Sequence, residues 1–158
     1  MLLHPLRSEQ LETLADQVRT TDEPTSELVS AVLVGTARRL SLPSSGADAV
    51  QLRQFIDAGA LTEAALALID AELPQWKLRR ITYDEGEWHC ALSRERELPD
   101  WLDQAVEVRH ASLTLAILSA YIETVRQIEM SREPSRPSVP QTPREREQYE
   151  PVCCDNFA

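Results

Sequence analysis

The sequence predicts an α+β fold in which a central antiparallel β-hairpin packs on a long core helix near the C-terminus. Three observations carry this prediction. Apolar residues recur at helical spacing through the first half of the chain, and the period changes to two within residues 76–93. Within residues 111–122, only Ser112, Thr114 and Ser119 are polar. A helix that is apolar on all sides is enclosed by protein, so this stretch is the expected centre of the core.

Length and charge limit the classes of function. The 158 residues suit one domain, residues 1–130, followed by a tail, residues 131–158. The formal charge of −10 argues against a nucleic-acid partner, which requires a basic surface, and against an anionic membrane. Acidity suits a basic protein partner, or serves only solubility.

The N-terminus shows no basic segment followed by a sustained apolar run, so we expect no secretory signal. The apolar run of the core is too short and too interrupted to span a bilayer. Cys90, Cys153 and Cys154 do not make a disulfide framework. We therefore expect reduced thiols in a cytoplasmic protein.

The first half is expected to be helical. A helical hairpin is predicted over residues 8–40, with Ser8 capping its first helix and Gly35 weakening the middle of its second. A DNA-binding helix-turn-helix is the alternative, but Arg38-Arg39 is the only basic pair there. A pair of helices packing on the core is the default interpretation.

Two further helices are predicted over residues 48–73. Asp48 and Gln51 have the spacing of a capping box. Gly59 is expected to end the first of these helices in a left-handed conformation. Thr62 is expected to cap the second helix, and Pro74 to stop it.

The β-hairpin is predicted over residues 76–93, with a three-residue loop at 84–86 that ends in glycine. The length of that loop determines how the two strands pair, and the pairing determines which side chains share a face of the hairpin. The expected pairs are Tyr83 with Glu87, Thr82 with Trp88, Arg80 with Cys90, and Leu78 with Leu92. The face expected to be dry carries Trp76, Leu78, Arg80, Trp88, Cys90 and Leu92, and the opposite face carries Lys77, Arg79, Ile81, His89 and Ser93.

A two-stranded hairpin is marginally stable in water and leaves both of its edges unpaired. The core helix is expected to cover its dry face. A second copy that pairs edge to edge across a two-fold axis would satisfy an edge, so a homodimer is a structural hypothesis.

The core helix is predicted over residues 99–130, starting at Pro99 and leaving room for a bend or break near Arg109-His110. Beyond it the composition changes, and a disordered Pro-rich tail is expected. Four prolines recur there at every third residue, the spacing of a polyproline II helix: Pro134, Pro137, Pro140 and Pro143. They suggest a protein-docking motif, against a plain spacer as the alternative.

Metal sites and acid–base sites are the other classes that the histidines, cysteines and acidic residues suggest. His89 and Cys90 are adjacent on a strand and point to opposite faces, so we expect no metal site and no cofactor. Acidic residues at the hairpin tip (Asp84, Glu85 and Glu87) lie near His89, a pattern compatible with a general base. Solvated turn formers are the simpler interpretation.

Arg80 is the residue that most suggests a ligand. On the predicted dry face it lies among Trp76 and Trp88, where a cation must be paired or stacked, or must anchor an anion. The leading expectation is a non-enzymatic protein-interaction or regulatory module. The alternative is a binder of a small anionic molecule, or an enzyme, using Arg80, Trp76 and Trp88. A third option is an acidic mimic of nucleic acid.

Overall fold

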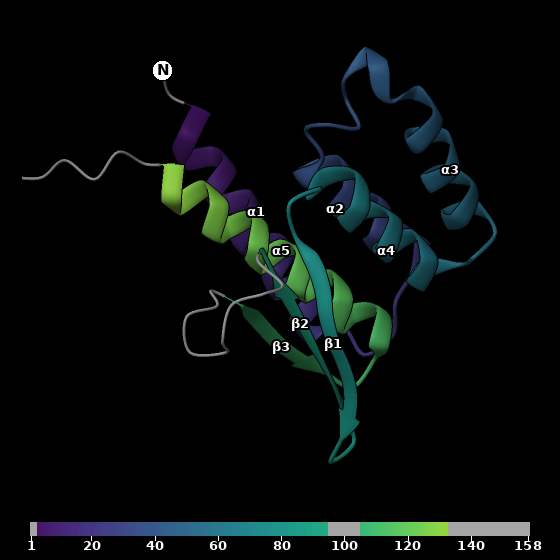
Figure 1. Ribbon diagram of the computed structural model, residues 1–158, viewed down its shortest axis with the longest axis vertical. Helices are drawn as coiled ribbons and strands as arrows, with labels where there is room; N and C mark the ends of the chain where they lie inside the picture. Colours follow the sequence, from purple (N-terminus) through teal and green to yellow (C-terminus); the bar gives the residue numbers. More distant parts are fainter. Residues whose placement is uncertain (1–2, 95–104, 133–158) are drawn as a thin grey trace, which may run out of the picture.

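The computed structural model describes residues 3–94 and 105–132, with side chains from residue 7 onward in the first helix (Figure 1). Helices and strands follow one another in the order expected of an α+β fold, with one strand more than the sequence suggested. The elements are α1 (Leu3–Thr20), α2 (Ser26–Thr36), the 3₁₀ helix η1 (Pro43–Ser45), α3 (Gly46–Asp57), α4 (Leu61–Glu72), β1 (Lys77–Asp84), β2 (Glu87–Ser93), β3 (Val106–His110) and α5 (Leu113–Arg132).

Helix α5 is the centre of the core, as predicted. The sheet packs on it through β2 and β3, and α1 and α4 pack on it from the helical side (Figure 1). Ten residues of α5 are buried, among them Leu115, Leu118 and Tyr121, which are fully buried. Burial on all sides explains why the sequence of this helix shows no polar stripe.

Three predicted helix starts are wrong. Helix α1 begins at Leu3, so Ser8 lies inside it rather than capping it. Helix α3 begins at Gly46, and its cap position makes no side-chain hydrogen bond, so Asp48 and Gln51 form no capping box. Thr62 lies inside α4, where its hydroxyl contacts the Thr114 hydroxyl at 2.7 Å. In each case the preceding residues could continue the helix, which a cap motif alone does not reveal.

The hairpin turn is shorter than predicted. Asp84 pairs with Glu87, so the loop has two residues, Glu85 and Gly86, both with positive φ (50° and 88°). Two positive φ values are the signature of the tight turn that matches the twist of a hairpin. The expected pairs Tyr83–Glu87, Thr82–Trp88 and Arg80–Cys90 are therefore displaced by one residue.

A β-bulge restores the rest of the predicted register. The pairing shifts between Leu78 and Arg80, so Leu78 pairs with Leu92 as expected. The extra residue in β1 changes which side chains face the core on the turn side of the bulge. Ile81 and Tyr83, rather than Arg80, share the dry face with Cys90 and Trp88. Arg80 and Thr82 are on the outer face.

The predicted helix over residues 99–130 is correct only in its second part. Residues 105 and onward enter β3, which pairs antiparallel with β2 and makes a three-stranded sheet in the order β1-β2-β3. Residues 106–110 alternate between half-buried and exposed, the period of two that a strand shows. Residues 99–104, and the prolines at 134, 137, 140 and 143, lie outside the described residues.

Candidate functional site

The three residues of the sequence-predicted ligand site do not come together. Arg80 lies on the outer face of the sheet, mostly exposed, with Nη2 at 2.8 Å from Glu107 Oε1. Trp88 is half-buried on the opposite face and contacts Tyr83, with ring centroids 5.0 Å apart. Trp76 is buried just before β1. The expected placement of Arg80 between two tryptophans is wrong because the bulge at Leu78/Arg80 reverses its face.

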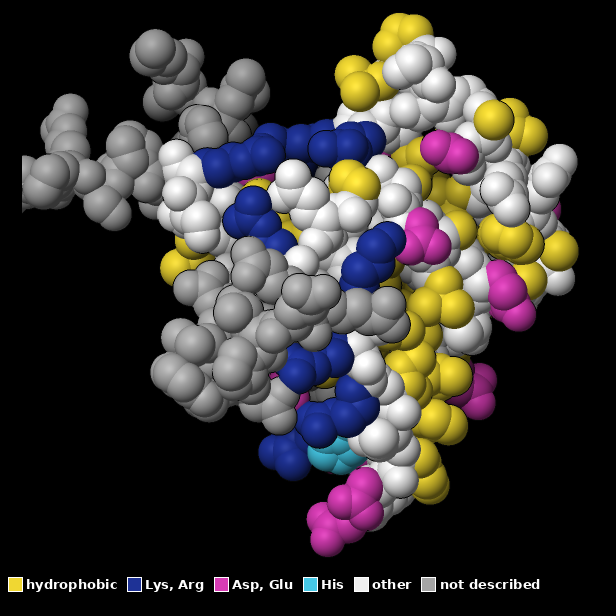
Figure 2. All heavy atoms as spheres, in the orientation of Figure 1, with side chains coloured by type: hydrophobic (Ala, Val, Ile, Leu, Met, Phe, Trp, Pro, Cys, Tyr) yellow, Lys and Arg dark blue, Asp and Glu magenta, His cyan; other side chains and the backbone are white. Residues whose placement is uncertain are grey.

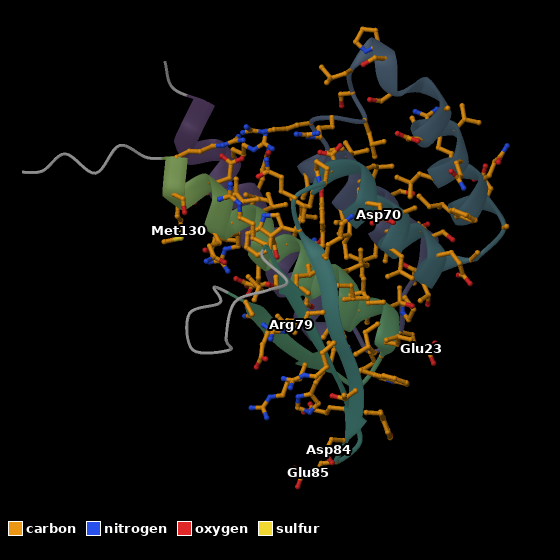
Figure 3. All side chains as sticks on the ribbon, viewed as in Figure 1. Glu23, Asp70, Arg79, Asp84, Glu85 and Met130 are labelled. Carbon is orange, nitrogen blue, oxygen red and sulfur yellow. The ribbon has the colours of Figure 1, made fainter. Side chains whose placement is uncertain are left out.

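The acidic residues of the hairpin tip point away from the body of the molecule, as the labels of Asp84 and Glu85 show in Figure 3. Glu87 and His89 share the outer face, as the predicted alternation placed them. Glu87 Oε2 lies 3.9 Å from Arg109 Nε, an ion pair on the outer face. No hydrogen bond or ion pair joins Glu87 to His89, so the arrangement adds nothing to the general-base hypothesis.

The thiol of Cys90 is part of the core. Burial raises the pKa of this thiol to about 12, which keeps it protonated and unreactive. Within residues 3–94 and 105–132, no three histidine, cysteine or acidic residues lie close enough together to hold a metal ion. A different part of the described chain gathers the charged side chains that could bind a ligand.

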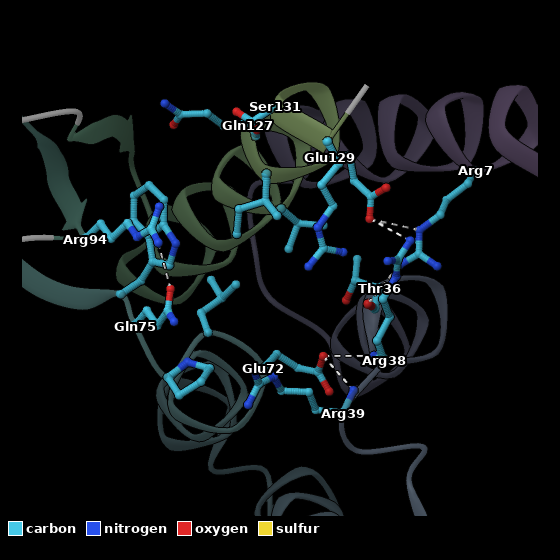
Figure 4. Close-up of a pocket in the computed structure, with 16 residues that line it drawn as sticks. Arg7, Thr36, Arg38, Arg39, Glu72, Gln75, Arg94, Gln127, Glu129 and Ser131 are labelled. Atoms are coloured by element: carbon cyan, nitrogen blue, oxygen red, sulfur yellow. Dashed lines mark hydrogen bonds and ion pairs between the residues drawn. The ribbon is translucent and has the colours of Figure 1, made fainter. Parts of the chain in front are cut away.

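That place is a cavity of about 460 Å³ where α1, α2, α4 and α5 meet the start of β1 (Figure 4). Its charged lining consists of five arginines and two glutamates: Arg7, Arg38, Arg39, Arg94, Arg132, Glu72 and Glu129. We call this the arginine cavity. In Figure 2, basic side chains gather on one side of the visible face, whereas most acidic side chains lie on the other side and at the hairpin tip.

Glu129 on α5 forms ion pairs with two of the arginines. Its Oε1 atom lies 2.8 Å from Arg38 Nη2 and 3.5 Å from Arg7 Nε. Arg7 also donates to the Thr36 carbonyl oxygen at 3.4 Å. The Nε atom of Arg7 is shielded from solvent and completes no hydrogen bond with a described residue. An arginine donor in that state leaves hydrogen-bonding capacity unused.

Glu72, at the end of α4, fixes the backbone beside the cavity. Its carboxylate accepts hydrogen bonds from three successive backbone N–H groups after α2: Arg38 at 2.8 Å, Arg39 at 3.1 Å and Leu40 at 2.7 Å. Helix α2 ends at Thr36, four residues before the predicted end at 40. Residues 37–40 form instead the segment whose backbone Glu72 binds. The Glu72 carboxylate is thus bound by backbone N–H groups, and no ion pair joins it to the Arg39 side chain.

The other three arginines of the cavity have no acidic partner among residues 3–94 and 105–132. Arg94 donates to the Gln75 side-chain oxygen at 3.1 Å, a neutral partner. The guanidinium groups of Arg39 and Arg132 contact no acidic side chain in the described part of the chain. Three of the five arginines therefore lack a carboxylate partner there, and the cavity carries an excess of positive charge in a chain of net charge −10.

The cavity also has an apolar and a buried polar wall. Leu73, Trp76, Val125 and Ile128 line it from the link before β1 and from α5. Thr36 lies at its border, and behind it the Tyr121 hydroxyl contacts Thr36 Oγ1 at 2.8 Å. Burial raises the pKa of the Tyr121 phenol, so this group stays neutral. A ligand that combines an anionic group with an apolar part matches these walls.

Sequence reasoning missed this site because its arginines come from separate segments. Arg7 preceded the predicted helix start, and Arg38-Arg39 was weighed only as a DNA-binding feature. Arg94 follows β2 and Arg132 ends α5. No spacing connects them, and only the packing of α1, α2, α4 and α5 brings them together. Trp76 is the one predicted ligand residue that lines the cavity.

The chain matches no protein-family model, no curated protein and no solved structure. None of the helices in residues 3–94 and 105–132 is both long and apolar enough to cross a membrane.

Proposed function

We propose that this chain is a non-catalytic binding module that holds an anionic small molecule in the arginine cavity. One observation carries the proposal. Five arginines from distant segments surround a single cavity, whose lining among residues 3–94 and 105–132 includes two glutamates, in a strongly acidic chain. Like charges repel one another, so an anion bound among these arginines would be stabilised by all of them.

The chemistry of the lining suggests phosphate or carboxylate groups. The guanidinium fork matches both groups with paired N–H donors. A volume of about 460 Å³ lies in the range that small-molecule sites occupy. Trp76 and Ile128 provide apolar surface beside the charges, so a ligand with an apolar part would gain affinity there.

Calorimetric titration with pyrophosphate and with citrate tests the proposal. We expect saturable binding of at least one of these multivalent anions, and weaker binding as salt concentration rises. Arg39→Gln and Arg132→Gln should each lower the affinity by about 10-fold or more, the effect of losing one charge-assisted hydrogen bond.

Arg53→Gln is the matched control, because Arg53 is exposed on α3 and does not line the cavity. Its affinity should equal that of the unmodified chain. Absence of saturable binding of both anions, or an equal loss in Arg53→Gln, contradicts the proposal.

Protein interaction, the function favoured by the sequence, is the second candidate. The exposed hydrophobic residues Ile81 and Tyr83 on the hairpin favour it, since their side chains are 36% and 61% exposed. The four prolines at 134, 137, 140 and 143, which the sequence suggests as a docking motif, also favour protein interaction. We expect a chain without residues 133–158 to capture a protein partner less well, and unchanged capture by the shortened chain would remove that segment from the candidate.

We propose a cytoplasmic location for the module. Its support is the cysteine pattern, which suits a reducing compartment. Cell fractionation in the native host, with thiols blocked during lysis, tests this location. Recovery of the chain outside the cytoplasmic fraction would contradict it.

A further inference from the structure

Strand β1 is an edge of the sheet. It pairs with β2 on one side, and no strand in residues 3–94 and 105–132 pairs with its other side. Residues 79–86, which form most of the hairpin's outer half, are all exposed. An unpaired edge that carries exposed apolar side chains is a template for strand addition.

The turn determines which backbone groups face outward. Asp84 and Glu87 close a two-residue turn, so they form a hydrogen-bonded pair, and the alternation of antiparallel pairing then directs Thr82 and Arg80 toward β2 as well. The N–H and C=O groups of Ile81 and Tyr83 therefore point to the free edge. Within residues 3–94 and 105–132, no backbone hydrogen bond uses these groups on that side.

We propose that this edge pairs with the same edge of a second copy of the chain, antiparallel, across a two-fold axis at Thr82. In this register Ile81 pairs with Tyr83 of the second copy through the outward-facing backbone groups. The pairing repeats on the other side of the axis. The two sheets become one sheet of six strands, with both dry faces on the same side.

Every cross-strand pair in this register is favourable. On the outer face, Arg80 lies opposite Asp84 of the second copy, and Thr82 lies opposite Thr82. On the dry face, Ile81 lies opposite Tyr83. Opposite charges, paired threonines, and an aromatic ring beside a β-branched side chain are the combinations that stabilise neighbouring strands. A displacement of the register by two residues would lose the charge pairs, so the complementarity selects one alignment.

The shape of the hairpin allows the approach. It extends beyond the helices with its tip free, and a strip of hydrophobic side chains follows one of its sides (Figures 1 and 2). Because the partner strand runs antiparallel, the bodies of the two copies lie at opposite ends of the paired segment. The bulge between Leu78 and Arg80 ends the pairing, which is limited to residues 80–84. So short a ladder predicts a dimer that dissociates on dilution.

The existing ion pair of Arg80 is compatible with the dimer. Arg80 Nη2 contacts Glu107 Oε1 on the outer face. Glu107 lies on β3, on the side of β1 away from the free edge, so Arg80 would exchange Glu107 for Asp84 of the second copy. That exchange costs little, because an exposed ion pair contributes little stability. The pairing uses no residue of the arginine cavity, so dimerisation and anion binding succeed or fail separately.

Sedimentation velocity over a range of protein concentrations tests the pairing with two charge-reversed variants. Arg80→Glu places like charges opposite each other in its own dimer, and so does Asp84→Arg. We expect each variant alone to remain monomeric at concentrations where the unmodified chain dimerises. In an equimolar mixture, both contacts become attractive, and a heterodimer should form.

Thr82→Glu adds an independent check. It places two negative charges against each other at the axis, while within one copy the new carboxylate faces His89 across the strand. Circular dichroism establishes that each variant is folded. A heterodimer from two monomeric variants supports the register. An unmodified chain that stays monomeric, variants that dimerise as it does, or a mixture that stays monomeric overturns the proposal.

Discussion

The buried pair of Thr36 and Tyr121 offers a quantitative test of how α2 is attached to α5. Tyr121 is fully buried, and its hydroxyl lies 2.8 Å from Thr36 Oγ1. Thr36 Oγ1 in turn donates to the Val32 carbonyl oxygen at 2.6 Å, so the phenol is the donor of the shared hydrogen bond. Each hydroxyl therefore satisfies the other in a place that water does not reach.

The two single substitutions should differ in cost. Tyr121→Phe removes one hydrogen bond and leaves the Thr36 hydroxyl still donating to the Val32 carbonyl oxygen, a loss of about 1 kcal/mol. Thr36→Val leaves the phenol O–H buried without an acceptor, a loss of about 1 to 3 kcal/mol. In the double variant that unsatisfied group is gone. Its total cost should fall below the sum of the single costs by about 1 kcal/mol.

Urea denaturation followed by circular dichroism measures all three variants under identical conditions. The slope of the unfolding free energy against urea should be the same in each, because the surface exposed on unfolding is nearly unchanged. Additive costs within about 0.4 kcal/mol would refute the pairing of these hydroxyls. A larger cost for Tyr121→Phe than for Thr36→Val would reverse the assignment of donor and acceptor.

Three further predictions concern the sheet and the glycines. Burial raises the pKa of the Cys90 thiol from 9.0 in the unfolded chain to about 12 in the folded one, so the free energy of unfolding should fall as the pH rises between these values. Denaturation at several pH values measures this dependence, and Cys90→Val should flatten it. Gly86→Ala, at φ 88°, should lose about 1 to 2 kcal/mol of stability, whereas Gly46→Ala, whose new methyl group meets nothing within 4 Å, should lose none in the same assay; equal losses would contradict the turn. Trp88→Ala should cost less than the roughly 3 to 5 kcal/mol of a fully buried tryptophan, because Trp88 is half-buried, and a cost within that range would mean that it is enclosed in solution.

Apolar patterning made the main architecture predictable. The helix that contains Leu115 and Leu118 has no polar side, and burial on all sides is the physical consequence. The left-handed conformation of Gly59 is also confirmed, with φ of 72°. Such features depend on local chemistry or on one face of one element, which the sequence displays directly.

Features that depend on the alignment of separate elements were not predictable. Residues 106–110 alternate as a strand should, but the alternation is short and merges with the helical pattern that follows it. The bulge in β1 compensates for the shorter turn, so the predicted pairing is correct at Leu78. Between the bulge and the turn it is not, and Arg80 therefore lies on the face opposite to the predicted one. The arginine cavity has no local signature, because its charges meet only after the helices have packed.

Side-chain nuclear magnetic resonance of the arginine Nε–H groups, during titration with pyrophosphate, tests the central claim most directly. We predict saturable changes at Arg39 and Arg132, which line the cavity without an acidic partner in the described residues. The signals of Arg19 and Arg53, which lie outside the cavity, should not change beyond the effect of added salt. Changes of equal size at all four arginines, or none that saturates, would show that the cavity does not bind anions.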